Sequence, residues 1–192
     1  MAAHIAFGAK LRSYRFDRYR TREKEEAKPT LQSFNLLVTD IAAARKAFAA
    51  RDKLADAIFT TRDLVSEPPN VIYPDTFAQQ AKTLKDLGVD VEVLDEKQMA
   101  KLGMGALLGV AQGSANEPRM VVMHWNGAGT GRGRDKKKPL VFVGKGVTFD
   151  TGGISIKPAG GMEDMKWDMG GSAAVIGLMR AVAGRKAKAN VI

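Results

Sequence analysis

From residue 66 onward the hydrophobic pattern alternates between strand and helix, and this alternation is the feature that most constrains the fold. Strands are expected at VDVEVL (89–94), MVVMHW (120–125), LVFV (140–143) and ANVI (189–192). Helical patterns separate them, and the most apolar of these is SAAVIGLMRAVA (172–183). Because a helix between two strands commonly returns the chain to the same end of the sheet, the sequence predicts an α/β fold with a mainly parallel sheet.

The first 65 residues follow a different pattern. Residues 3–20 favour an amphipathic helix with a basic outer side, and residues 33–38 (SFNLLV) favour a short strand. Asp40 is placed to cap a long helix that extends to about Leu64. The prolines of SEPPN (66–70) cannot be helical, so this motif marks a boundary between the long helix and the α/β region.

Composition excludes several classes of protein. The chain has no cysteine, which excludes disulfide scaffolds, thiolate zinc sites and cysteine nucleophiles, and which fits a cytoplasmic location. No apolar run approaches the ~18 residues that a membrane-spanning helix needs, so we expect no membrane association.

The net charge of +9 is concentrated in two stretches. Residues 1–29 carry eight Lys and Arg against four acidic residues, and residues 131–138 (GRGRDKKK) carry five against one. Such a distribution favours a solvated helix face and a charged loop over a continuous surface that follows phosphates. A basic module that binds nucleic acid or another anionic surface is therefore an alternative hypothesis, and the less favoured one.

The glycine-rich run at residues 144–171 holds most of the candidate chemistry. It follows a predicted buried strand, and open α/β sheets place their sites at the carboxyl ends of strands. Within it lie three aspartates and three lysines: Asp150, Asp164, Asp168, Lys145, Lys157 and Lys166. Carboxylates without Cys or His favour Mg²⁺ or Mn²⁺, and a mixed oxygen and nitrogen site also accepts Zn²⁺. A Walker loop is excluded because Gly146, not Ser or Thr, follows Lys145.

This run resembles the metal-binding signature of the cytosol (leucyl) aminopeptidase family. SEPPNVIYPDTF (66–77) and GSANEPRMVVMHW (113–125) are similar to family segments in the same order and at similar spacing. The resemblance implies that residues 1–38 are the C-terminal end of an N-terminal α/β domain and that residues 39–65 are a connecting helix. Residues 66–192 would then be the first part of the catalytic domain.

The same resemblance implies the roles of individual residues. Lys145, Asp150 and Asp168 match metal ligands of the family, and Lys157 matches its catalytic lysine. Two divalent ions per subunit are implied, with Mn²⁺ first and Zn²⁺ or Mg²⁺ as alternatives. The substrates would be peptides with a free N-terminus, leucine preferred, and the full-length protein would be a homohexamer. Three methionines are candidates for part of the side-chain pocket: Met162, Met165 and Met169.

The resemblance also implies that the site is incomplete. The family places two further metal-binding carboxylates and a catalytic arginine in a downstream Asn-Thr-Asp-Ala-Glu-Gly-Arg block, which does not occur here. One amine and two carboxylates fall short of the four to six donors that each metal ion expects. We therefore expect this chain alone to have negligible activity. A non-catalytic relative of the family is a further alternative.

Overall fold

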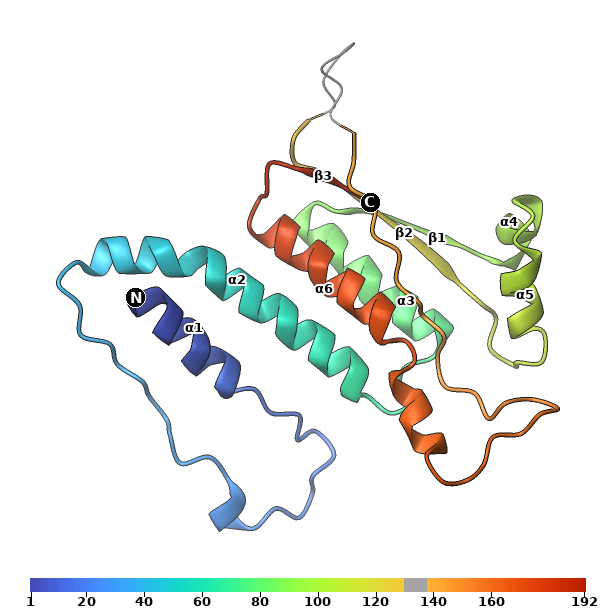
Figure 1. Ribbon diagram of the computed structural model, residues 1–192, viewed down its shortest axis with the longest axis horizontal. Helices are drawn as coiled ribbons and strands as arrows, with labels where there is room; N and C mark the ends of the chain where they lie inside the picture. Colours follow the sequence, from blue (N-terminus) through green and yellow to red (C-terminus); the bar gives the residue numbers. More distant parts are fainter. Residues whose placement is uncertain (130–137) are drawn as a thin grey trace.

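The structure is a computed structural model that describes residues 1–129 and 138–192 (Figure 1). Its α-helices are α1 (Ala2–Arg12), α2 (Ile41–Ser66), α3 (Pro74–Lys82), α4 (Glu96–Lys101), α5 (Gly105–Ala111) and α6 (Gly170–Gly184). Its 3-10 helices are η1 (Glu25–Ala27), η2 (Thr83–Leu87) and η4 (Met162–Trp167). Its strands are β1 (Asp90–Leu94), β2 (Met120–Asn126) and β3 (Asn190–Val191). The predicted α/β alternation after residue 66 is therefore confirmed.

Local capping explains where several helices begin and end. The Asp40 carboxylate accepts a hydrogen bond from the Ala43 N–H at 2.9 Å and so caps α2. Asp95 caps α4 by accepting from the Gln98 N–H at 2.8 Å, and the Gln98 side chain accepts from the Asp95 N–H in return. Gly88 ends η2 in the left-handed region at φ 85°, which glycine adopts without a steric penalty.

The sheet has the order β1-β2-β3, and both of these strand pairs are antiparallel. The expectation of a mainly parallel sheet is wrong for these strands. Because α4 and α5 are short and lie beyond one end of β1 and β2, the chain turns back there instead of crossing a face of the sheet (Figure 1). Among the described residues, Leu140 and Val191 form an isolated parallel bridge, and α6 lies between these two residues in the sequence.

The predicted strand at residues 140–143 is reduced to this bridge and its flanking hydrogen bonds. The Leu140 N–H donates to the Asn190 carbonyl at 2.9 Å, and the Ile192 N–H donates to the Leu140 carbonyl at 2.9 Å. The Phe142 N–H continues the ladder by donating to the Ile192 carbonyl at 2.8 Å. This short ladder sets where the glycine-rich run leaves the sheet.

The core lies between the sheet and the helices α3 and α6, which both contact β2. Val91 and Met123 are opposite each other in the register of β1 and β2, and both side chains are buried. From α6, Ile176 and Met179 fill the space above them. α2 packs on α6 and α1 packs on α2, so the N-terminal helices form further layers on that side (Figure 1). No helix in the described part of the chain has the length and apolar character needed to cross a membrane.

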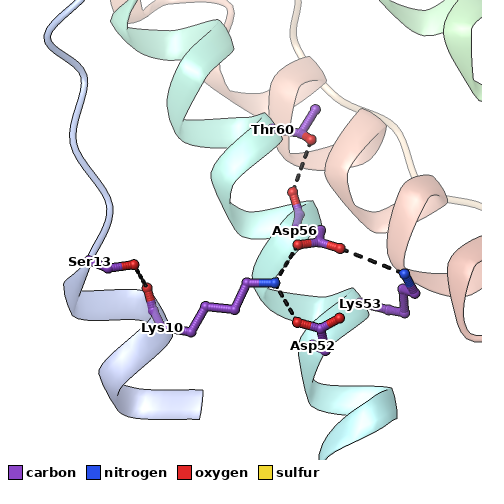
Figure 2. A network of polar contacts seen from close by, with 6 residues as sticks. All are labelled: Lys10, Ser13, Asp52, Lys53, Asp56 and Thr60. Atoms are coloured by element: carbon purple, nitrogen blue, oxygen red, sulfur yellow. Dashed lines mark hydrogen bonds and ion pairs between the residues drawn. The ribbon is translucent and has the colours of Figure 1, made fainter. Parts of the chain in front are cut away.

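The first 40 residues depart most from the sequence-based expectations. The helix predicted for residues 3–20 ends at Arg12, and the strand predicted for residues 33–38 is wrong because these residues have no regular secondary structure. α1 is held to α2 by a polar network around Lys10 (Figure 2). The Lys10 ammonium lies 2.5 Å from the Asp52 carboxylate and 2.6 Å from the Asp56 carboxylate. The basic side of the N-terminal helix therefore faces acidic residues of α2 and not only solvent.

Candidate metal centre

Two segments that cross closely carry the four predicted site residues. Lys145, Asp150 and Lys157 lie in the irregular run after the sheet, and Asp168 lies between η4 and α6. The Ser172 hydroxyl donates to the Gly144 carbonyl at 2.7 Å, and the Ser172 N–H donates to the Lys145 carbonyl at 2.8 Å. These bonds fix the start of α6, and therefore Asp168, against the segment that carries Lys145.

Glycine is required at this crossing. A Cβ atom at Gly144 would lie 2.5 Å from the Gly171 carbonyl oxygen and 2.7 Å from the Ser172 Cα. Both neighbours are backbone atoms, which cannot rotate away as the end of a side chain can. The glycine-rich composition of the run is thus used to bring two backbones, each with a charged side chain, into contact.

The four side chains form two lysine–aspartate ion pairs. The Lys145 ammonium pairs with the Asp168 carboxylate and also approaches the Asp168 carbonyl at 3.4 Å. The Lys157 ammonium pairs with the Asp150 carboxylate and also donates to the Asp150 carbonyl at 3.2 Å. Each lysine therefore stands beside an aspartate that is distant from it in sequence, by 23 and 7 residues respectively.

A tight loop brings Lys157 back to Asp150. The Gly152 N–H donates to the Asp150 carboxylate at 2.8 Å, and the Lys157 N–H donates to the Thr151 carbonyl at 2.9 Å. Gly152 has φ 106°, and a Cβ atom there would lie 2.4 Å from the Ser155 carbonyl oxygen. The loop therefore depends on glycine at this position, because both the dihedral angle and the space exclude a side chain.

The electrostatics link the two pairs. The hydrogen bond from Lys157 lowers the pKa of Asp150 below its usual value of 3.8, more than partial burial of the carboxyl raises it. The Gly152 N–H and the charges of Lys157 and Lys145 lower the pKa further. Because the charge of Lys145 acts on Asp150 as well as on its own partner Asp168, the two pairs lie within one electrostatic environment.

The site is open to solvent. The exposed fraction of the side chain is 49% for Asp150, 41% for Asp168 and 56% for Lys145, against 31% for Lys157. A dissolved ion or a substrate can therefore reach all four groups.

The donor types fit a divalent metal ion, but their number is small. Two carboxylates and one neutral amine are oxygen and nitrogen donors of the kind that Mn²⁺ and Zn²⁺ accept. Among the described residues, no group of three or more His, Cys, Asp or Glu side chains is placed to hold a metal ion. The described residues thus bring these donors together as two ion pairs.

Other residues singled out from the sequence lie apart from these pairs. Met169 is 1% exposed and belongs to the hydrophobic core, so its candidacy for a substrate pocket is wrong. Met162 and Met165 are partly exposed on η4, and Asp164 is exposed. Ser172 has a structural role because its hydroxyl ties α6 to Gly144.

The N-terminal cations give little support to the nucleic-acid alternative. Ion pairs with carboxylates involve five of them: Lys10, Arg15, Arg18, Arg20 and Lys28. Their charge is therefore largely balanced within the chain. The second basic stretch, residues 131–138, falls outside the described residues except for Lys138.

Comparison with known proteins decides the family. The family described as "Cytosol aminopeptidase family, catalytic domain" matches residues 59–192. This chain belongs to the cytosol aminopeptidase family. The resemblance identified from residues 66–77, 113–125 and 144–171 is thereby confirmed. The matched residues include all four members of the two ion pairs.

Relatives of this family member extend the match over the whole chain. Proteins named "Probable cytosol aminopeptidase" from Bradyrhizobium and Caulobacter vibrioides are each 59% identical to it, over 191 and 192 residues. The match covers 100% of this chain but only 37% and 38% of those proteins. The chain therefore spans a little over a third of the length of these relatives.

Solved structures agree with the fold of this family member. The bottromycin maturation enzyme BotP in complex with Mn is 33% identical, with a TM-score of 0.78 over 99% of this chain and 38% of that one. A tomato leucine aminopeptidase is 31% identical, with a TM-score of 0.80 over 98% of this chain and 35% of that one. The α/β fold of a partial domain is therefore shown by comparison as well as by the structure.

Proposed function

We propose that this chain supplies part of the active site of a two-metal aminopeptidase. Lys145, Asp150 and Asp168 are the proposed metal ligands, and Lys157 is the proposed catalytic residue. The observation that carries the proposal is the pairing of two lysines with two aspartates at one exposed crossing of the chain. Membership of the cytosol aminopeptidase family and the manganese in the BotP complex support it.

The proposed ligands offer two carboxylates and one amine, all of them accessible to solvent. When bound, divalent metal ions supply Lewis acidity and lower the pKa of water, and Mn²⁺ is the first candidate, ahead of Zn²⁺ or Mg²⁺. Asp150 and Asp168 compensate the positive charge of the ions. Lys145 ligates only as the neutral amine, so it must lose its proton and its ion pair with Asp168, which a nearby dication favours.

Lys157 is suited to a different role because it is not one of the proposed metal ligands and pairs with Asp150. Its side chain is less exposed than those of Lys145, Asp150 and Asp168. The tight loop that contains Gly152 holds it close to Asp150. In the reaction it would donate hydrogen bonds to the oxyanion that forms when water adds to the scissile carbonyl carbon. Its charge is thus used to stabilise substrate oxygen, while Asp150 serves the metal ions.

The remaining proposals concern the whole protein. We propose that it removes N-terminal residues, leucine preferred, from peptides in the cytoplasm, and that it works as a homohexamer. Residues 1–38 would belong to its N-terminal domain, residues 39–65 to the connecting helix and residues 66–192 to its catalytic domain.

Metal binding by the chain tests the proposed ligands. Mn²⁺ titration followed by electron paramagnetic resonance should show binding that Asp150→Asn weakens about tenfold or more, because one of the two proposed carboxylate ligands is lost. Asp164→Asn is the matched control, since Asp164 is an exposed aspartate of the same run. Equal affinity of the wild-type chain and Asp150→Asn would contradict the ligand assignment.

Activity tests the proposed incompleteness of the site. The chain with Mn²⁺ should not measurably hydrolyse leucine-p-nitroanilide, because its two carboxylates and one amine are too few donors for two metal ions. Turnover that Lys157→Ala abolishes would show instead that these residues suffice for catalysis.

A further inference from the structure

Glu67 is a buried carboxylate at the junction between α2 and the α/β region. Its side chain is 5% exposed, and it follows the last residue of α2 immediately before the Pro68-Pro69 pair. Burial of a carboxylate is costly unless hydrogen bonds and an opposite charge compensate it. Its partners therefore indicate what holds this junction in place.

Both partners of the Glu67 carboxylate come from the N-terminal segment. The Arg18 guanidinium pairs with one carboxylate oxygen, and the Tyr19 hydroxyl donates to the other at 2.5 Å. One turn earlier on α2, Asp63 accepts from the Tyr14 hydroxyl at 2.9 Å. Residues 14–19 thus bind the last two turns of α2 through the carboxylates of Asp63 and Glu67.

Neighbouring residues of the same helix end pack against the segment that carries Asp168. Leu64 is buried in the core cluster that contains Met169, the residue after Asp168. Val65 packs against this cluster, and its Cγ2 would lie 3.9 Å from a Cβ atom at Gly170. α2 also contacts η4, which leads into Asp168. The end of α2 therefore packs against the segment that positions Asp168.

We propose that Glu67 is a positioning residue for Asp168. By binding Arg18 and Tyr19 it locks the end of α2 to the N-terminal segment, and the locked helix end holds η4 and Asp168 opposite Lys145. Residues 14–19 thereby take part in shaping a site that they do not touch. The importance of Asp168 to metal binding rests on the proposed function, whereas its placement by Glu67 does not.

Trp167 provides a local reporter because it lies on η4 next to Asp168 and is 50% exposed. The other tryptophan, Trp125, lies in β2 and donates to the Ala187 carbonyl at 2.9 Å, so it reports on the sheet. In the chain labelled with 5-fluorotryptophan, Glu67→Ala should shift or broaden the ¹⁹F resonance of Trp167 by more than its linewidth. The Trp125 resonance should stay in place.

Two further variants make the result specific. Glu67→Gln keeps an acceptor for Tyr19 and loses the charge opposite Arg18, so it should move the Trp167 resonance less than Glu67→Ala does. Asp52→Ala removes a contact between the same two segments near the middle of α2, and it should leave both resonances unchanged. Equal movement of both tryptophans, movement of neither, or an equal effect of Asp52→Ala would each overturn the positioning role.

The effect on metal binding is a separate measurement. Glu67→Ala should lower the Mn²⁺ affinity about tenfold, the lower end of the effect of outer-shell changes at metal sites. An unchanged affinity would overturn the link between Glu67 and metal binding. Because the ¹⁹F experiment needs no metal, a chain that binds no Mn²⁺ would count against the proposed function, and the positioning role would still be decided by Trp167.

Discussion

Replacing Gly144 by alanine should disrupt the crossing that brings Lys145 to Asp168. The new methyl group would lie 2.5 Å from the Gly171 carbonyl oxygen, 2.6 Å from the Gly171 carbonyl carbon and 2.7 Å from the Ser172 Cα. Overpacking of this kind costs about 1–3 kcal/mol. If the segments separate, the hydrogen bond from Ser172 to the Gly144 carbonyl is also lost, at about 0.5–1.5 kcal/mol. The expected loss is therefore roughly 1.5–4.5 kcal/mol.

Urea unfolding and thermal melting measure this loss. For a chain of this size, 1 kcal/mol corresponds to about 2–4 °C in Tm, so the expected decrease is roughly 3–18 °C. Gly160→Ala is the matched control, because nothing lies within 4 Å of a Cβ atom at Gly160 and the residue belongs to the same glycine-rich run. If Gly144→Ala were as stable as Gly160→Ala, the close crossing of the two segments would be refuted.

Three further predictions concern packing and charge. The pKa of Lys10 is raised above 10.5, since hydrogen bonds and charges of two α2 aspartates together outweigh the lowering by partial burial, the largest single influence. The stabilisation of the fold by the Lys10 ion pairs is therefore fully present below pH 10.5 and is lost as the pH rises through the raised pKa of the folded state. In Lys10→Met, the urea midpoint should consequently depend less on pH in this alkaline range. Gly177→Ala would place a methyl group 2.1 Å from the Thr61 hydroxyl and should destabilise the α2–α6 contact by about 1–3 kcal/mol in urea unfolding, with partial recovery in the Thr61→Ala background. The chain should bind random duplex DNA only weakly in a fluorescence anisotropy titration at physiological salt; tight binding that falls steeply with salt would favour the basic-module alternative.

Local signals in the sequence predict a helix boundary where a capping residue is present, whereas the helix predicted for residues 3–20 ends at Arg12. Asp40, Gly88 and Asp95 act through their own dihedral angles and side-chain hydrogen bonds, so their neighbours suffice to predict α2, η2 and α4. Strand direction is different, because it depends on where the chain travels between strands. The short helices α4 and α5 lie beyond the sheet end instead of across its face, and no local pattern specifies this.

The same distinction applies to the candidate site. The resemblance of residues 144–171 to the family signature implied that Lys145, Asp150, Lys157 and Asp168 act together, and in the structure these residues form two ion pairs. The pairing of Lys145 with Asp168 depends on the contact between Gly144 and Ser172, which is a tertiary feature. The part played by Glu67 was not visible in the sequence, since its partners Arg18 and Tyr19 lie almost 50 residues earlier, at separations of 49 and 48.

Paramagnetic broadening by Mn²⁺ tests the central claim most directly. In ¹H–¹⁵N spectra of the chain, substoichiometric Mn²⁺ should broaden the amide signals of Asp150 and Asp168 together, because both carboxylates are proposed to serve one metal centre. Asp150→Asn should remove the broadening at Asp168 as well. Broadening confined to other acidic residues, or broadening at Asp168 that persists in Asp150→Asn, would contradict a shared centre built from the two lysine–aspartate pairs.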